Sequence, residues 1–301
     1  MSKQKILIQI DGDPHASSFD SIVAIDAGVE RLLPYHNVSS MEVQTIVHGA
    51  MFTRGVDDLK STALFFGGSD VEQTSSLFRA AQKCFFGPVR VSMMSDPNGS
   101  NTTAVAAVLS AESHIELRGK TVTVLAATGP VGLRVAQLAY AQGGNVRVCS
   151  RRRERAASVC AAVKEMYLEE AADNDVLGEL VPQETDSPMQ TLDAIRGADV
   201  MFSAGAAGVE LVSDAWQELD SPPRIAIDLN AVPPAGIEGV EVTDKAEERN
   251  GTLCYGAIGV GGLKMKIHKQ CIRTLFESND CVLATREIYE IGKKMAGKPV
   301  A

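Results

Sequence analysis

KTVTVLAATGPVGLRVAQLAYAQGGNVRVCSRRR, residues 120–153, is the stretch that decides the fold of this chain. Its first apolar, β-branched run, Thr121 to Ala126, predicts a strand that is buried on both faces. A turn of small residues then opens a helix, and residues 145–149 predict a second strand. Strand, turn, helix and strand in this order are typical of a Rossmann-type dinucleotide-binding unit with a parallel sheet.

The turn departs from the full glycine pattern of dinucleotide-binding proteins. Ala127 stands where the first glycine is expected, so the glycines alone are a weak signal. The start of the helix nevertheless offers free N–H groups and a helix dipole, which together attract anions. The residues expected to contact the cofactor here are Thr128, Gly129, Pro130, Val131 and Gly132.

The second strand ends in basic residues, where an NAD-binding protein usually has an acidic residue for the ribose 2′-OH. Ser150, Arg151 and Arg152 stand there instead. A hydroxyl and guanidinium groups bind a 2′-phosphate, which a carboxylate would repel. We therefore expect NADP as the cofactor. The alternative is that these arginines are the solvated start of a helix, although cations oppose the dipole at that end.

Two further strand ends supply small or polar residues for the cofactor. In an open α/β sheet, ligands bind beyond the carboxyl ends of the strands, near the point where strand order reverses. Ser203, Ala204, Gly205 and Ala206 let the backbone approach a ribose or nicotinamide, although a plain tight turn explains them equally well. Asn230 offers an amide for a ring or carboxamide, with a turn cap before the prolines that follow as the alternative.

Length and composition predict a soluble globular protein. The 301 residues suffice for one large or two ordinary domains, and 45% of them are hydrophobic and 22% charged. The net charge of −9 argues against a general nucleic-acid or anionic-membrane binder. No run approaches the roughly 18 apolar residues that indicate a membrane span, so none is expected.

Cysteine and histidine spacing indicates neither a disulfide framework nor a metal site. The six cysteines lie far apart without a C-x-x-C pair, which predicts reduced core thiols and a cytoplasmic location. The lysine-flanked start lacks a cleavage site of small residues, so it is not expected to be a signal peptide. The five histidines are scattered, and no metal ligand set is expected.

Alternation of strand and helix patterns predicts an α/β protein of two domains. The other expected strands lie at 5–10, 63–66, 89–94, 198–202 and 224–229. The other expected helices lie at 19–33, 40–51, 71–85, 100–112, 156–170, 263–276 and 281–295, with a short one ending near 197. We expect the dinucleotide-binding domain over 113–276. A second α/β substrate domain is expected to combine 1–112 with the C-terminal helix in 277–301.

Polar side chains between a predicted strand and helix indicate part of a substrate site. Residues 96–103 carry more hydroxyls and amides than one helix cap requires. The candidates in this segment are Asn98, Ser100, Asn101 and Thr102. Binding the polar groups of a substrate is the function that we favour for them.

Phe19, Asp20 and Lys264 complete the expected substrate site. Asp20 lies near a helix start, where it serves equally well to compensate the helix dipole. Lys264 is expected in the first turn of the 263–276 helix, where a cation is disfavoured and the preceding glycines leave room for a ligand. The alternative is an exposed lysine whose stem covers apolar surface. His268 is expected to pack rather than to react.

Six stretches carry a resemblance that runs along nearly the whole chain. They are FGPVRVSMMSDPNGSNTTA, LAATGPVG, SAGAAGVEL, DLNAVPPAGI, GAIGVGGLKMKIH and CIRTLFES. Together they closely resemble the bacterial NADP-dependent methylenetetrahydromethanopterin dehydrogenases of one-carbon metabolism. The DPNGSNTTA and GGLKMKIH runs are specific to that group, whereas the glycine turn is not.

The resemblance implies that the methylene group bridging two nitrogens of a reduced pterin is oxidised. A hydride passes to NADP+ and the product is a methenyl cation. The resemblance also implies a homo-oligomer. Some members accept methylenetetrahydrofolate, so the choice between the two pterins stays open.

The implied reaction asks little of acid–base side chains. The bridging nitrogens share the developing charge and no proton moves in the hydride step, so the protein need only hold the two rings and exclude water. The alternative function is a non-catalytic NADP-binding sensor or partner-binding module of the same fold. A hydroxy-acid dehydrogenase would need a proton acceptor, for which no histidine is well placed.

Overall fold

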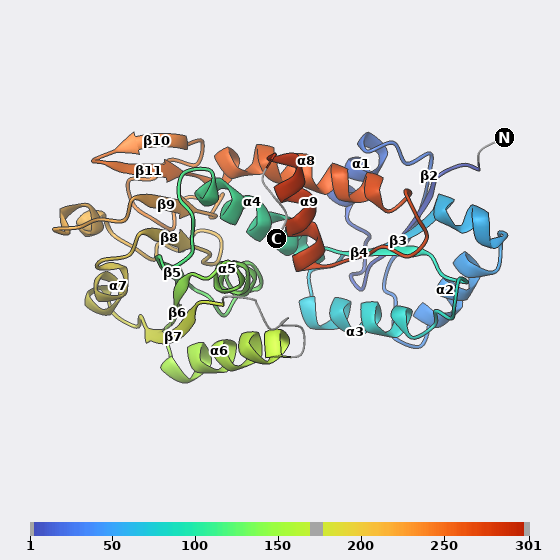
Figure 1. Ribbon diagram of the computed structural model, residues 1–301, viewed down its shortest axis with the longest axis horizontal. Coiled ribbons are helices and arrows are strands. Elements are labelled where there is room, and N and C mark those ends of the chain that lie inside the picture. Colours follow the sequence, from blue (N-terminus) through green and yellow to red (C-terminus); the bar gives the residue numbers. More distant parts are fainter. Residues whose placement is uncertain (1–2, 169–176, 298–301) are drawn as a thin grey trace. The chain divides into compact units, whose positions relative to one another are not determined.

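The computed structural model describes residues 3–168 and 177–297 (Figure 1). These residues form two compact units, one of 3–102 with 264–297 and one of 103–168 with 177–263. Each unit contains one largely parallel sheet with helices, which confirms the predicted α/β class. The division falls within helices α4 (Ser100–Glu112) and α8 (Ala257–Thr274), rather than near their C-terminal ends as expected from the sequence.

The first unit is built on a parallel five-stranded sheet in the order β12-β4-β3-β1-β2. Its strands are β1 (Ile6–Ile10), β2 (Arg31–Tyr35), β3 (Thr62–Phe66), β4 (Ser92–Ser95) and β12 (Val282–Leu283). Its helices include α1 (Ser18–Asp26), α2 (Val43–Met51), α3 (Val71–Gln82), α9 (Thr285–Met295) and the 3-10 helices η1 (Val56–Ser61) and η2 (Pro97–Gly99). Apolar side chains of β1 and β3 pack with those of α2 and α3 to form its core.

The second unit is built on a seven-stranded sheet in the order β10-β11-β9-β8-β5-β6-β7. Its strands are β5 (Thr121–Leu125), β6 (Asn145–Ser150), β7 (Glu179–Glu184), β8 (Val200–Ser203), β9 (Ile225–Asp228), β10 (Lys245–Arg249) and β11 (Thr252–Tyr255). Its other helices are α5 (Pro130–Ala141), α6 (Arg153–Leu168), α7 (Pro188–Ile195) and η3 (Asp214–Glu218). Only β10 runs antiparallel to its neighbour, and strand order reverses at β5, as in doubly wound nucleotide-binding sheets.

The helices predicted at 19–33 and 263–276 differ in their bounds from those in the structure. Residues 19–33 do not form one helix, because α1 ends at Asp26 and Gly28 turns the chain toward β2 with a φ of 98°. A left-handed residue of this kind commonly ends a helix. The glycine-rich segment before residue 263, expected as a loop, forms the first turns of α8. A Cβ at Gly259 would overlap the carbonyl group of Asp244, so glycine here allows a helix to pack directly on backbone.

Strands β2, β7, β10, β11 and β12 were not predicted, and β12 lies in residues that were expected to begin the 281–295 helix. The sequence of β10, KAEER, lies at the edge of its sheet with mostly exposed side chains, so it lacks the apolar pattern that predicts a strand. The sequence of β7, ELVPQE, lacks an apolar run, yet it pairs in parallel with β6 along its whole length. This omission matters for the site, because the C-terminal end of β7 lies beside that of β6.

Candidate functional site

The strand–turn–helix at the start of the second unit forms as predicted. Strand β5 ends at Leu125 and α5 begins at Pro130, a residue suited to the first helical position. A Cβ at Gly132 would lie 2.7 Å from the carbonyl oxygen of Ala126 and 2.8 Å from the Cα of Ala127. A Cβ at Gly129 would make only an ordinary contact of 3.5 Å. Gly132 is therefore the glycine that lets the helix pack against the end of the strand.

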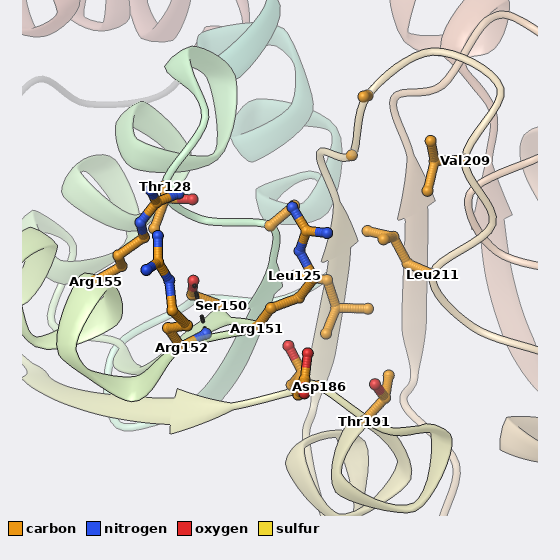
Figure 2. A pocket seen from close by; sticks show the side chains of 14 residues that line it. Leu125, Thr128, Ser150, Arg151, Arg152, Arg155, Asp186, Thr191, Val209 and Leu211 are labelled. Carbon is orange, nitrogen blue, oxygen red and sulfur yellow. Dashed lines mark hydrogen bonds between the residues drawn. The ribbon is translucent and has the colours of Figure 1, made fainter.

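A cavity of about 540 Å³ lies at the C-terminal ends of β5, β6 and β8 (Figure 2). This is where the strand order reverses, the usual ligand site of such sheets. The structure brings together at this cavity the predicted cofactor residues Thr128, Ser150, Arg151, Arg152, Gly205 and Ala206.

The other predicted cofactor residues do not line this cavity. They are Gly129, Pro130, Val131, Gly132, Ser203, Ala204 and Asn230. Asn230 is buried, and its amide nitrogen donates to the carbonyl oxygen of Pro234 at 2.9 Å. Its amide oxygen accepts from the backbone N–H of Val232 at 3.0 Å. These bonds make Asn230 a turn cap, which is the alternative stated for it above.

Three guanidinium groups give the cavity its charge. Arg151, Arg152 and Arg155 all line it, and none of the three forms a side-chain hydrogen bond or ion pair with another residue of the described ranges. Ser150 is buried beside them and accepts weakly from the backbone N–H of Arg152 at 3.4 Å. The arginines also lie at the start of α6, whose dipole adds positive potential. Unpaired cations and a hydroxyl at a helix start suit a phosphate group.

Several lining residues were missed from the sequence. They are Leu125, Ala126, Arg155, Thr185, Asp186, Thr191, Val209 and Leu211. Arg155 belongs to the basic run and lies one helical turn after Arg152, so the spacing could have indicated that both side chains lie on one face of the helix. Thr185 and Asp186 follow β7, so they were hidden because that strand was not predicted.

The first unit contains a second polar cavity, of about 250 Å³. It brings together four of the predicted substrate residues, Phe19, Asp20, Asn98 and Lys264. The Nζ atom of Lys264 lies 5.0 Å from the centre of the Phe19 ring, within cation–π range. Lys264 lies about two turns into α8. The prediction that it lies in the first turn, where it would oppose the dipole, was therefore wrong.

Asp20 is the most perturbed carboxyl group of this cavity. Burial raises its pKa to about 7, and the charge of Asp96 acts in the same direction. The hydroxyl of Ser17 and the cation of Lys264 oppose the rise. A carboxyl that titrates near neutral pH in a polar cavity is a candidate for ligand binding.

Ser100, Asn101 and Thr102 do not line this cavity. All three are buried. The Ser100 hydroxyl donates to the carbonyl oxygen of Pro97 at 2.6 Å, and the Thr102 hydroxyl donates to the Asp96 carboxylate at 2.6 Å. The backbone N–H groups of Asn101 and Thr102 donate to the same carboxylate. The excess of polar residues thus serves mainly to anchor the start of α4 on Asp96.

His268 packs within the first unit, as expected. Its ring is buried and stacks on Phe65 with centroids 5.6 Å apart. Burial lowers its pKa, which favours the neutral ring, although Asp96 lies 3.9 Å away.

Comparison with known proteins places the chain in a family. It is 40% identical over 298 residues to the bifunctional protein MdtA of Methylorubrum extorquens, covering 98% of this chain and 100% of that protein. The chain belongs to the methylene-tetrahydromethanopterin dehydrogenase family. Residues 18–98 match the model described as methylene-tetrahydromethanopterin dehydrogenase, N-terminal. The resemblance stated from the sequence is confirmed.

One further sequence relative and one solved structure are similar to the chain over most of its length. The NAD(P)-dependent methylenetetrahydromethanopterin dehydrogenase of Methylorubrum extorquens is 30% identical over 295 residues, covering 94% of this chain and 96% of that protein. The solved 5-ketofructose reductase of Gluconobacter sp. strain CHM43 has a TM-score of 0.51 at 13% identity, covering 97% of this chain and 99% of that one. That likeness shows a shared fold.

Neither a membrane-spanning helix nor a cluster of metal ligands occurs among the described residues. Within 3–168 and 177–297, no helix combines the length and apolar character needed to cross a bilayer. Nor does this part of the chain gather three or more His, Cys, Asp or Glu side chains in a way that would hold a metal ion.

Proposed function

We propose that this protein oxidises the methylene group of methylenetetrahydromethanopterin with NADP+ as hydride acceptor. The observation that carries the proposal is the cavity at the switch point of the second sheet, with three unpaired guanidinium groups at its wall. The chain that carries this cavity is 30% identical to a relative that is named NAD(P)-dependent methylenetetrahydromethanopterin dehydrogenase.

The residues of this cavity fit NADP. Ser150, Arg152 and Arg155 would hold the 2′-phosphate, because guanidinium groups bind phosphate oxygens bidentately. Thr128, at the cavity wall, and the free N–H groups at the start of α5 that follow it would hold the pyrophosphate. The segment from Ser203 to Ala206 would border the ribose. When bound, NADP+ supplies the carbon that accepts the hydride.

The polar cavity of the first unit would hold the pterin. Phe19 offers an exposed ring face. Asp20 offers a carboxyl group, Asn98 an amide and Lys264 an ammonium group. A cation beside the carbon that becomes positive would oppose hydride departure, so we assign Lys264 to a pterin carbonyl oxygen. These residues position the substrate and transfer no proton.

One assay tests the reaction directly. Mixing the protein with NADP+ and methylenetetrahydromethanopterin is expected to raise methenyl-pterin absorbance, and no rise would refute the function. Arg152→Ala is expected to increase KM for NADP+ about tenfold or more, since a hydrogen bond to a charged group contributes about 1.5–3 kcal/mol. KM for NAD+ is expected to change little. Arg153→Ala, in the same run but outside the cavity lining, is the matched control.

The competing function is a non-catalytic NADP-binding sensor. A thermal shift caused by a reduced pterin as well as by NADP+ favours the enzyme, whereas a shift with NADP+ alone favours the sensor. Competition between the tetrahydromethanopterin and tetrahydrofolate forms would decide which pterin is preferred.

We further propose a cytoplasmic homo-oligomer. The six cysteines are free thiols in the structure, which supports a reducing compartment. Self-association rests on the family resemblance, and light scattering of the purified protein tests it.

A further inference from the structure

The cavity of the second unit has two chemically different sides. Ser150, Arg152, Arg155 and Thr128 gather polar and cationic groups on one side (Figure 2). An adjoining hollow of about 310 Å³ shares Arg151, Thr185, Asp186, Thr191, Val209 and Leu211 with the main cavity. The aliphatic side chains of Val209 and Leu211 therefore lie apart from the cluster of Ser150, Arg152 and Arg155 (Figure 2).

Apolar side chains on this second side are arranged for a flat ring. Val209 is 45% exposed, although it is a large aliphatic residue, and it lines both hollows together with Leu211. Arg151, whose planar guanidinium stacks readily on aromatic rings, lines both as well. Exposed aliphatic side chains in the same hollow as a guanidinium group suit a purine base, because both kinds of group pack on aromatic rings.

Asp186 is the unexpected residue of this wall. A carboxylate would repel a phosphate bound nearby, yet Asp186 lines a cavity with three guanidinium groups. No ion pair or hydrogen bond joins its carboxylate to another residue in 3–168 or 177–297. Its backbone N–H donates to the Gln190 side chain at 3.0 Å, which fixes the residue at the start of α7. The backbone of Asp186 is thus anchored, and its carboxylate is available to accept hydrogen bonds from a ligand.

We propose that Asp186 recognises the adenine of NADP by accepting a hydrogen bond from its 6-amino group. The proposal rests on the NADP dependence proposed above. The apolar side of the cavity holds the base, and the Asp186 carboxylate at the edge of that side reads the one exocyclic donor that adenine presents. Asp186 is then a specificity-determining residue for the base, separate from the arginines that choose between NADP and NAD.

An analogue with hypoxanthine in place of adenine tests this assignment. Hypoxanthine has a carbonyl oxygen where adenine has the 6-amino group, so an acceptor faces the Asp186 carboxylate. Wild-type protein is expected to bind NADP+ about tenfold more tightly than nicotinamide hypoxanthine dinucleotide phosphate, a factor appropriate to one charge-assisted hydrogen bond. Calorimetry or a thermal shift measures both affinities without turnover.

Asp186→Asn supplies the decisive comparison. An amide can donate to the hypoxanthine carbonyl oxygen, so the variant is expected to lose the preference and bind both dinucleotides within about twofold. Asp193→Asn, in helix α7 that follows Asp186 but paired with Arg196 outside both hollows, is the matched control and should retain the tenfold preference.

Other outcomes overturn the proposal in distinguishable ways. If Asp186→Asn keeps the tenfold preference, Asp186 does not read the base, although NADP binding stands. If the variant binds NADP+ more tightly while its affinity for NAD+ is unchanged, Asp186 faces the 2′-phosphate instead. If wild-type protein binds neither NADP+ nor its analogue, the proposed function itself fails.

Discussion

The buried carboxyl of Asp20 makes the stability of the first unit depend on pH. Its pKa in the folded protein is about 7, raised from 3.8 by burial. The folded state therefore binds the proton more tightly than the unfolded state does. Stability from this group is fully present below about pH 4 and is lost as pH rises through 7. Between about pH 5 and pH 8 the loss integrates to roughly 2.5 kcal/mol.

Replacing Asp20 by asparagine isolates this effect. The amide cannot ionise, so Asp20→Asn is expected to gain roughly 2.5 kcal/mol relative to wild type on going from pH 5 to pH 8. Urea unfolding followed by circular dichroism at several pH values measures the difference in the free energy of unfolding. Taking the difference between the two proteins cancels most contributions from other titrating groups.

Asp26→Asn is the matched control for this experiment. Asp26 lies on the same helix with a half-exposed side chain that pairs with Lys269 at 2.8 Å. Its difference from wild type is expected to vary little between pH 5 and pH 8. If the Asp20→Asn difference is also flat over that range, Asp20 is already ionised at pH 5 in the folded protein and its pKa is not raised to about 7.

Two other predictions concern packing. Gly132→Ala forces a Cβ to within 2.7 Å of the Ala126 carbonyl oxygen, so we expect a loss of about 1–3 kcal/mol in the free energy of unfolding and weaker NADP+ binding. Gly129→Ala, whose Cβ would lie 3.5 Å from the same oxygen, should change both quantities little. Equal thermal shifts for the two variants would contradict this. Thr102→Val removes a 2.6 Å bond to the buried Asp96 carboxylate, so a loss of about 1.5–3 kcal/mol is expected in chemical denaturation, and an unchanged midpoint would show that the bond contributes nothing.

Local patterns in the sequence were sufficient for the parts of the site that are contiguous in the chain. The apolar run of β5, the small-residue turn and the basic end of β6 follow one another directly, and the parallel pairing of β5 with β6 brings their ends together. The identity of Arg151 and Arg152 as cavity residues followed from that order. Asn98 and Lys264 were also found, although the reason given for Lys264 was wrong.

Residues brought together from separate elements were less accessible. Asp186 reaches the cavity only because β7 pairs with β6, and β7 is too polar to be recognised by its pattern. The polar run at Ser100 to Thr102 predicted a ligand site, but these side chains turn inward to Asp96. Side-chain direction depends on helix orientation, which composition does not report.

The α/β class, the strand–turn–helix–strand unit and the basic end of β6 could be predicted from the sequence, because each depends on short-range order along the chain. Which side chains line the two cavities, and the raised pKa of Asp20, depend on the tertiary structure. Burial of Asp20, the inward turn of Thr102 and the placement of Asp186 beside the arginines all arise from contacts between elements distant in sequence. Desolvation and steric exclusion act only once those elements have packed.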